Sequence, residues 1–315
     1  MKNASITMKK DKITELTEIL TKNKRPTDGL MYVLIYLSAF LSVGLLLCII
    51  GYVVVKGIGK VDFQFLFTEK SVLKGSDGIL GNTVNTLYII ILTLLIATPV
   101  GVGSAVYLTE YSRPGRVVRL IEFTTETLAG IPSIIFGMFG KVFFAEVLGL
   151  GYSLLTGAFT LTLMVLPLVT RNTQEALKTV PESYRSGALG MGAGKWYMIR
   201  TIILPSAMPG IITGVILAIG RIVGESAALL FTAGSAYSIP NISMNGNVLG
   251  DVIFPLLEKY TQSGGTLTIE MYLRMTKGQY EGAFGIAVVL LIIVFLINFL
   301  AKALAAKFDV YKKEG

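Results

Sequence analysis

Residues 171–225 read RNTQEALKTVPESYRSGALGMGAGKWYMIRTIILPSAMPGIITGVILAIGRIVGE, and this stretch decides the fold. Its first part is polar, is broken by glycines and carries five basic residues, yet apolar runs at 152–169 and 203–231 flank it. Such a segment cannot lie in hydrocarbon, where its polar groups would find no partners. We therefore expect a structured loop in water, over 171–205, held between two membrane-spanning helices.

The whole chain has the composition of a membrane protein. Of its 315 residues, 53% are hydrophobic and only 15% are charged, and the mean hydropathy is +0.68. These values are too apolar for an ordinary water-soluble domain. A helix that crosses a bilayer needs ~20 apolar residues. The sequence predicts an all-α, polytopic membrane protein of about six transmembrane helices, in the runs 31–55, 79–108, 127–148, 152–169, 203–231 and 283–303.

The basic residues gather in alternate connections between these runs. They precede the first span, lie between spans two and three, fill the polar loop between helices 4 and 5, and recur in the tail. With six spans all of these segments lie on one side, and basic loops are typically cytoplasmic. We therefore expect a multi-pass protein of a bacterial or archaeal plasma membrane with both termini in the cytoplasm. The net charge of +8 then reflects topology in the lipid bilayer, not nucleic-acid binding.

The longest external segment, 234–282, is rich in Gly, Asn, Ser, Thr and Tyr and contains amphipathic pieces at 252–260 and 269–275. It is too long for a simple turn, so we expect it to fold over the outer face, either to bind a partner or to cap the helices. The expected organisation is a cytoplasmic segment 1–30, a membrane domain 31–305 and a tail 306–315.

The polar loop has the signals of a helix–turn–helix. Pro181 suits the first position of a helix, and Glu182 favours the positive end of its dipole. Three glycines within 190–194 then end that helix and permit a sharp turn. A second short helix, 195–203, leads into the fifth span. A soluble protein that gripped this rigid lever would move both flanking helices at once.

The run GMGAGK at 190–195 resembles a phosphate-binding loop only superficially. The pattern G-x-x-x-x-G-K-[ST] would require glycine at Leu189 and Ser or Thr at Trp196, after a buried strand. We therefore expect no ATP site in this chain, and the energy for any pumping must come from another subunit.

Charges inside the fifth span are the strongest candidates for function. Arg221 and Glu225 are four residues apart, so on a continuous helix they would share a face. An arginine in the bilayer costs about 2.5–3.5 kcal/mol on insertion scales, so it should face a polar path or a carboxylate. A guanidinium suits oxyanions such as phosphate or sulfate. The alternative is an ion pair that fixes helix packing, and Gly210/Gly214 and Gly220/Gly224 would allow such close packing.

The loop also resembles that of ABC importer permeases, whose pattern is E-A-A, three residues, G, nine residues, I-x-L-P. Ser186, Gly187 and Ala188 occupy the first three positions, Gly192 the glycine, and Ile202, Leu204 and Pro205 the end. Serine replaces glutamate and glycine replaces the first alanine. The resemblance implies the type-I importer permease fold and a loop that docks into a cleft of the ATPase subunit. This docking role falls on Ser186, Gly187, Ala188 and Gly192, and the same coupling loop includes Glu182, Arg185, Leu204 and Pro205.

Three further runs are similar to the permeases of phosphate-specific ABC importers: LAGIPSIIFGMFG at 128–140, LPLVTRNTQEALKTVP at 166–181 and GRIVGESAALLFTAG at 220–234. The last run looks more like the A-type subunit than the C-type one. The resemblance implies a heterodimer with a C-type permease, two cytoplasmic ABC ATPase subunits that hold ATP and Mg²⁺, and an extracytoplasmic phosphate-binding protein. It places Arg221 and Glu225 on the translocation path, with Ser133, Thr83 and Asn85 as further polar lining.

Other functions remain open at this point. A related permease could carry sulfate or molybdate, and an ion-coupled carrier would need no ATPase. A membrane-embedded enzyme has little support, because the chain contains no histidine and no span holds a clustered nucleophile and base. The single cysteine, Cys48, lies in the first span and is expected to pack there as a small apolar residue.

Overall fold

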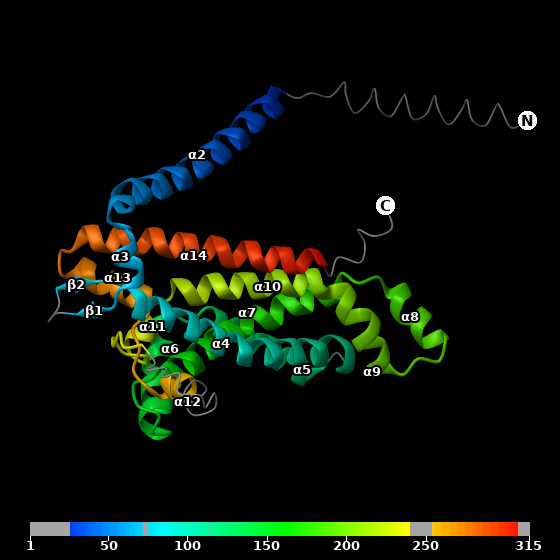
Figure 1. Cartoon of the computed structure of the whole chain (residues 1–315). Coiled ribbons are helices and arrows are strands. Elements are labelled where there is room, and N and C mark those ends of the chain that lie inside the picture. Colours follow the sequence, from blue (N-terminus) through cyan, green and yellow to red (C-terminus); the bar gives the residue numbers. More distant parts are fainter. Residues whose placement is uncertain (1–25, 72–74, 114, 240–253, 308–315) are drawn as a thin grey trace, which may run out of the picture. The chain divides into compact units, whose positions relative to one another are not determined.

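The computed structural model describes residues 26–71, 75–113, 115–239 and 254–307, and this part of the chain is almost entirely helical (Figure 1). The chain divides into two compact units, residues 1–55 and 56–315. The described part of the first unit is the apolar helix α2 (Pro26–Gly57), whose end leads into the second unit. The second unit holds every other described element.

Among the described residues, five helices are long and apolar enough to cross a membrane. A further pair, Arg116–Ala129 and Ser133–Val147, passes the same test together but is bent by 101°. Five of the six apolar runs are therefore confirmed as candidate spans, and the third lies in the bent pair. The five helices are Gly29–Lys60, Leu80–Tyr111, Leu154–Lys178, Lys195–Gly224 and Tyr280–Ala303.

The centre of the second unit is the packing of α4 (Leu80–Val106) and α10 (Leu204–Gly224) against α7 (Leu154–Lys178). Small residues allow these helices to approach closely. A Cβ on Gly101 of α4 would lie 2.7 Å from the Val169 side chain of α7, and one on Gly214 of α10 would lie 2.6 Å from Asn172. The close packing predicted at Gly214 is thus confirmed.

Hydrogen bonds fix the direction of these helices. Ser153 and Leu154, at the start of α7, donate backbone N–H groups to Thr232 O at 3.1 Å and Gln262 O at 3.0 Å. Asn85, near the start of α4, donates to the nearby Gly265 O at 3.2 Å. Both helices therefore begin at the end of the bundle that carries α13 (Leu267–Thr276), here called the α13 end. They run toward the opposite end, which carries α8 (Glu182–Gly190), here called the α8 end (Figure 1).

The chain between α4 and α7 must return across the bundle, because both helices run the same way. After α4 and its π-helical extension η2 (Tyr107–Tyr111), this return consists of α5 (Arg116–Ala129), α6 (Ser133–Gly140) and the π-helical η3 (Lys141–Val147). The predicted run 127–148 is wrong as a straight helix. Pro132 lacks an N–H and disfavours helical backbone in the preceding residue, so the chain bends between α5 and α6.

Short elements cover the α13 end. They include the hairpin β1 (Lys70–Ser71) and β2 (Ser76–Asp77), whose strands pair antiparallel, and the small helices η1 (Ile58–Lys60) and α3 (Phe63–Phe67). The predicted external segment 234–282 supplies α12 (Phe254–Glu258), η6 (Lys259–Thr261) and α13. Over the described residues, α12 and most of η6 lie in the amphipathic piece 252–260, and α13 contains the piece 269–275. Residues 240–253 of that segment lie outside them.

A buried ion network holds these elements together. The Arg274 side chain of α13 is 1% exposed, and its Nε donates to Glu270 Oε1 at 2.7 Å. Its other nitrogens reach Asp77 at 3.0 Å, and Lys70 Nζ bonds to Glu270 Oε1 at 2.6 Å. A buried pair of this kind stays favourable only when further hydrogen bonds satisfy both partners, which is the case here. The network ties the hairpin to α13.

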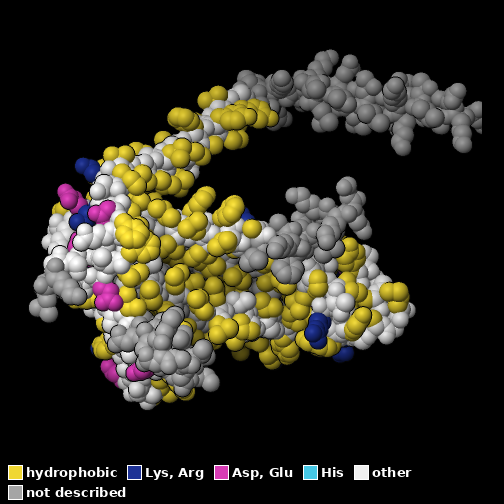
Figure 2. Space-filling view, viewed as in Figure 1, with side chains coloured by type: hydrophobic (Ala, Val, Ile, Leu, Met, Phe, Trp, Pro, Cys, Tyr) yellow, Lys and Arg dark blue, Asp and Glu magenta, His cyan; other side chains and the backbone are white. Residues whose placement is uncertain are grey.

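The surface of the second unit matches a bilayer setting. Figure 2 shows hydrophobic side chains over the middle of the helices, with charged side chains toward the two ends. On α14 (Tyr280–Lys307) the exposed apolar residues include Phe295 and Phe299, which are 70% and 63% exposed. Such side chains are stable when they face lipid.

Candidate functional site

The polar segment after α7 is shorter than the sequence indicates. The prediction that it begins at Arg171 is wrong, because residues 171–178 continue α7 to Lys178. Thr173, Ala176 and Leu177 are buried at helical spacing, while Arg171 stays exposed and pairs with Glu175 at 3.4 Å. Amphipathic packing therefore extends the helix beyond its apolar run.

The expected helix–turn–helix is present. α8 begins after Pro181, whose ψ of 139° is extended, and Glu182 lies in the first turn. It ends at Gly190, and Gly192 has a φ of +83°, which favours glycine. Two hydrogen bonds close the turn: Gly192 N to Leu189 O at 2.9 Å and Ala193 N to Ala188 O at 3.0 Å.

The second helix of this motif is continuous with the fifth span. α9 (Lys195–Met198) passes through the π-helical η4 (Ile199–Ile203) into α10, and together they form one helix, Lys195–Gly224. Leu204 and Pro205 lie at the start of α10 and are half-buried. They join the motif to the span and are not part of the exposed face of α8.

Most of α8 and its turn is exposed. Among the predicted docking residues, Ser186, Gly187 and Gly192 are exposed, whereas Ala188 is 3% exposed. Ala188 packs in a small apolar core with Met198 and Ile199. Its side chain therefore packs α8 against the rest of the protein and is not available for contact with a partner. The turn presents Met191, which is 85% exposed.

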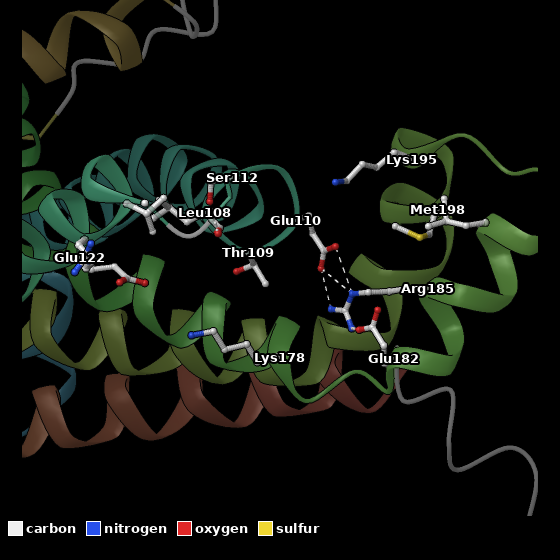
Figure 3. A pocket seen from close by; sticks show the side chains of 14 residues that line it. Leu108, Thr109, Glu110, Ser112, Glu122, Lys178, Glu182, Arg185, Lys195 and Met198 are labelled. Carbon is white, nitrogen blue, oxygen red and sulfur yellow. Dashed lines mark hydrogen bonds and ion pairs between the residues drawn. The ribbon is translucent and has the colours of Figure 1, made fainter.

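One arginine connects α8 to two other helices. Arg185 donates from Nη2 to Glu110 Oε1 at 2.8 Å and from Nε to the same oxygen at 3.2 Å. It also donates to the backbone carbonyls of Leu177 and Val180, both at 2.9 Å, and to Glu182 Oε2 at 3.2 Å. Figure 3 shows Glu110 and Arg185 pointing toward one another. The hydrogen bond to Glu110 raises the pKa of Arg185, although burial alone would lower it.

A cavity of about 790 Å³ opens beside this ion pair (Figure 3). Its walls come from η2, from α5, from the end of α7 and from the α8–α9 motif. Charges of both signs line it, so it is a polar hollow and not a selective anion site. The lining residues are Leu108, Thr109, Glu110, Ser112, Gly115, Val118, Arg119, Glu122, Lys178, Glu182, Arg185, Leu189, Lys195 and Met198.

At the other candidate site, the helix that carries Arg221 ends sooner than predicted. α10 ends at Gly224, and Glu225 has a ψ of 128°, so Glu225 does not share a helix face with Arg221. The Glu225 carboxylate instead caps the next short helix, α11 (Ala227–Leu230), by accepting the Ala228 N–H at 3.0 Å. The Glu225 carbonyl accepts the Thr268 hydroxyl of α13 at 2.8 Å. These bonds hold the break in place.

Arg221 lies in the last turn of α10 and is half-buried. A cation there is favourable for the helix dipole. Its guanidinium makes no ion pair or hydrogen bond with any described residue, so no ion pair with Glu225 fixes the helix packing.

The further lining candidates differ from one another. Asn85 is fully buried, and its amide nitrogen donates hydrogen bonds to Ala236 O at 3.1 Å and to Gly265 O. The Thr83 hydroxyl donates within its own helix to Ile79 O at 3.0 Å. Ser133 is half-buried at the start of α6, and its hydroxyl bonds to no described residue. The amide nitrogen of Asn85 thus has structural partners, while its buried Oδ1 has none among the described residues.

Sequence reasoning missed Glu110 and Thr268. Glu110 is a lone carboxylate at the end of an apolar run, in LTEYSRPGR, and that isolation is the only signal that could have drawn attention to it. Its partner is 75 residues away in sequence. For metals, no cluster of three or more His, Cys, Asp or Glu side chains occurs among the described residues.

A protein-family comparison identifies the class of this membrane protein. Residues 97–310 match the model of the family "Binding-protein-dependent transport system inner membrane component". This match covers more than half of the chain and includes the last part of α4, all of α8 and the break after α10. The chain belongs to this family. It is a permease subunit of the ABC importer type, an integral component of the inner membrane.

Several relatives resemble this permease along much of their length. It is 35% identical over 295 residues to the "Probable ABC transporter permease protein YqgI" of Bacillus subtilis, covering 92% of this chain and 98% of the relative. It is 37% identical over 221 residues to the "Phosphate transport system permease protein PstA" of Pasteurella multocida, covering 70% of this chain and 78% of that one. The predicted resemblance to A-type phosphate permeases is therefore confirmed.

Solved structures show the same fold at low identity. A chain of a bacterial alginate ABC transporter aligns with a TM-score of 0.61 at 14% identity, covering 90% of this permease and 96% of that chain. A chain of the MetNI methionine ABC transporter aligns with a TM-score of 0.53 at 22% identity, covering 73% and 94%. The predicted type-I importer permease fold is confirmed.

Proposed function

We propose that this permease forms half of the transmembrane pathway of an ATP-driven importer of inorganic phosphate. It would pair with a C-type permease and bind two copies of a cytoplasmic ATPase, which hold ATP and Mg²⁺. An extracytoplasmic phosphate-binding protein would deliver the anion at the α13 end. The protein itself then performs no chemical reaction, and its work is a change of shape.

The observation that carries the ATPase-coupling part is the form of α8. It is an exposed helix with a glycine turn, fixed to a core by Ala188 and to neighbouring helices by Arg185. A soluble motor that grips Ser186, Gly187 and the Gly192 turn can therefore push on a rigid element. An ion-coupled carrier would have no use for such a surface.

The phosphate part rests on Arg221 and on the relatives. A guanidinium with no partner among the described residues, at the end of a spanning helix, suits a tetrahedral oxyanion through paired charge-assisted hydrogen bonds. Several relatives are named as phosphate transport permeases, at 36–37% identity. Sulfate and molybdate share the same geometry, so the experiment must compare them.

The orientation follows from the basic residues. Lys178, Arg185, Lys195 and the arginines 113–119 all belong to the α8 end, and basic connections favour the cytoplasm. On this proposal the α8 end faces the ATPase in the cytoplasm and the α13 end faces outward. Both termini then lie inside.

The test is uptake by reconstituted vesicles. The full complex, with both permeases, the ATPase and the binding protein, is placed in liposomes loaded with ATP and Mg²⁺. We expect labelled phosphate to accumulate and a large excess of unlabelled sulfate or molybdate to leave uptake unchanged. Competition by sulfate would reassign the substrate. Uptake by liposomes that contain this chain alone, without ATPase, would contradict the proposal.

A further inference from the structure

We infer that the Arg185–Glu110 ion pair links α8 to α4, so that movement of α8 is passed to the opposite end of the bundle through α4. Both residues would then be positioning residues of the transport cycle. This inference rests on the proposed function, because it assumes that a motor pushes on α8. It concerns a role that neither the fold nor the family match assigns to these two side chains.

The hydrogen bonds of Arg185 connect three helices. All three guanidinium nitrogens of Arg185 are occupied, by the Glu110 carboxylate, by Glu182 and by the carbonyls of Leu177 and Val180. The two side chains are 14% and 5% exposed. A planar guanidinium with several fixed acceptors has little freedom to rotate, so it transmits displacement in more than one direction. One residue thus joins α8, the end of α7 and the end of α4.

α8 has few other connections to the bundle. Of its nine residues only Ala188 is buried, and it belongs to an apolar cluster that also includes Ala105 and Val106 of α4. Apolar contacts have no fixed direction, whereas Arg185 bonds to Glu110 at 2.8 and 3.2 Å. The Glu110 carboxylate is therefore the directional contact between α8 and the helix that begins as α4.

The other end of α4 holds the segment that covers the α13 end. The Asn82 side chain donates to Gly265 O at 2.9 Å, and the Thr86 hydroxyl accepts the Leu267 N–H at 2.9 Å. Asn85 adds its bonds to the same segment. From Leu80 to Tyr111 the helix is continuous over 32 residues, which is roughly 48 Å at the α-helical rise. One rod therefore connects the surface of α8 to the start of α13.

The local backbone at Glu110 fits a moving joint. Glu110 lies in the π-helical turn η2, and η4, beyond α8, is a second such turn. Widened turns of this kind are frequent at functional sites. The α8 motif therefore meets π-helical turns at two places: at η2 through the Arg185–Glu110 pair, and at η4, which follows α9 in the chain. The coupling runs through packed, hydrogen-bonded elements, which is the physical requirement for transmission between distant sites.

The first experiment measures how much ATP the reconstituted complex hydrolyses for each anion that it transports. Glu110→Gln keeps the shape of the side chain but removes its charge. We expect ATP hydrolysis to continue while the ATP used per phosphate rises at least roughly fivefold, the lower end of typical coupling between sites. The matched control is Glu126→Gln, which removes an ion pair between α5 and α7 whose side chains are 64% and 62% exposed. The control should keep the wild-type ratio, and an unchanged ratio in Glu110→Gln would overturn the inference.

A covalent rescue separates transmission from simple folding. Cys48 is the only cysteine, so the background is Cys48→Ser, with Glu110→Cys and Arg185→Cys added. We expect this complex to be uncoupled until a short bismaleimide joins the two thiols, after which the ATP used per phosphate returns toward the background value. A crosslinked complex that stays uncoupled contradicts the inference. This variant decides the matter if Glu110→Gln does not assemble.

Failure of the proposed function has a different signature. A wild-type complex that accumulates another oxyanion contradicts only the phosphate assignment, and the same ratio is then measured with that anion. A wild-type complex whose transport does not depend on ATP contradicts the proposed function and the link together. With a coupled wild type, the link alone is rejected by an unchanged ratio in Glu110→Gln or by a crosslinked complex that stays uncoupled.

Discussion

At the scale of single residues, Arg221 is the sharpest candidate for contact with the transported anion. If its free guanidinium binds the anion, Arg221→Ala should lower phosphate uptake by roughly 10- to 100-fold, because a hydrogen bond to a charged group contributes about 1.5–3 kcal/mol. Arg221→Lys keeps the charge but loses the planar guanidinium, so its phosphate uptake should lie between that of the wild type and that of Arg221→Ala. Uptake by vesicles that contain the whole complex measures the effect.

The control for Arg221 is Arg171→Ala, which removes an exposed arginine of α7 whose ion pairs lie at the surface. It should leave uptake near the wild-type value. Co-purification of the partner subunits shows that each variant assembles. Unchanged uptake in an assembled Arg221→Ala complex would remove this residue from the transport path.

Glu225 has a structural role that can be separated from a role in transport. Its carboxylate caps α11, so Glu225→Ala should destabilise the permease by about 1 kcal/mol, the usual cost of losing a helix cap. Glu225→Gln keeps an acceptor oxygen for the Ala228 N–H and should melt close to the wild type. Thermal unfolding of the purified complex in detergent compares them. If Glu225→Gln melts normally but loses uptake, the charge acts in transport as well.

Residue roles were predictable where composition alone decides them. An arginine in an apolar run stands out, and the place of Arg221 on the transport path stays a prediction. The capping by Glu225 was not predictable, because the end of α10 at Gly224 depends on the bond between Glu225 O and Thr268, far away in sequence. The Glu110–Arg185 pair was hidden for the same reason.

At the scale of elements, the turn after α8 depends on one glycine. Gly192 has a φ of +83°, with no atom within 4 Å of an added Cβ, so a substitution there meets backbone strain without a clash. Gly192→Ala should destabilise the turn by about 1–2 kcal/mol and weaken ATPase binding. Co-purification of the ATPase and the melting temperature of the complex are the measurements.

Gly187→Ala is the matched change for this turn. Gly187 also has open space around it, but its backbone is helical, so alanine should be tolerated or slightly stabilising there. A Gly187→Ala complex that loses the ATPase while Gly192→Ala keeps it would show that the surface of α8, and not the turn, decides docking.

The elements show where sequence patterns stop being informative. The length of an apolar run predicts a spanning helix, and this is confirmed for five of the six runs. It did not predict that α7 continues to Lys178, because burial of Thr173 and Leu177 depends on neighbouring helices. Nor did it reveal the 101° bend, although Pro132 marks its place.

At the scale of the whole molecule, the direction of the helices fixes the number of crossings. α4 and α7 both run from the α13 end to the α8 end, so the bent pair α5–α6–η3 has to cross between them. α14 starts at the α13 end, where Phe284 lies against Gly57, and runs back. The last described residues of α14 therefore lie at the α8 end. With the bent pair counted as one span, the described residues supply six candidate crossings.

This topology predicts the outcome of reporter fusions. Alkaline phosphatase fused after Leu150, between η3 and α7, should be active, because that connection belongs to the α13 end and is expected outside the cell. The same enzyme fused after residue 315 should be inactive, while a fluorescent protein at that position should fold and fluoresce in the cytoplasm. A third fusion after Arg113, between η2 and α5, should be inactive. If α5–α6–η3 instead re-entered without crossing, the fusions after Arg113 and Leu150 would report the same side. That result would contradict the hydrogen bonds of Ser153 and Leu154 with residues 232 and 262, which place the start of α7 at the α13 end.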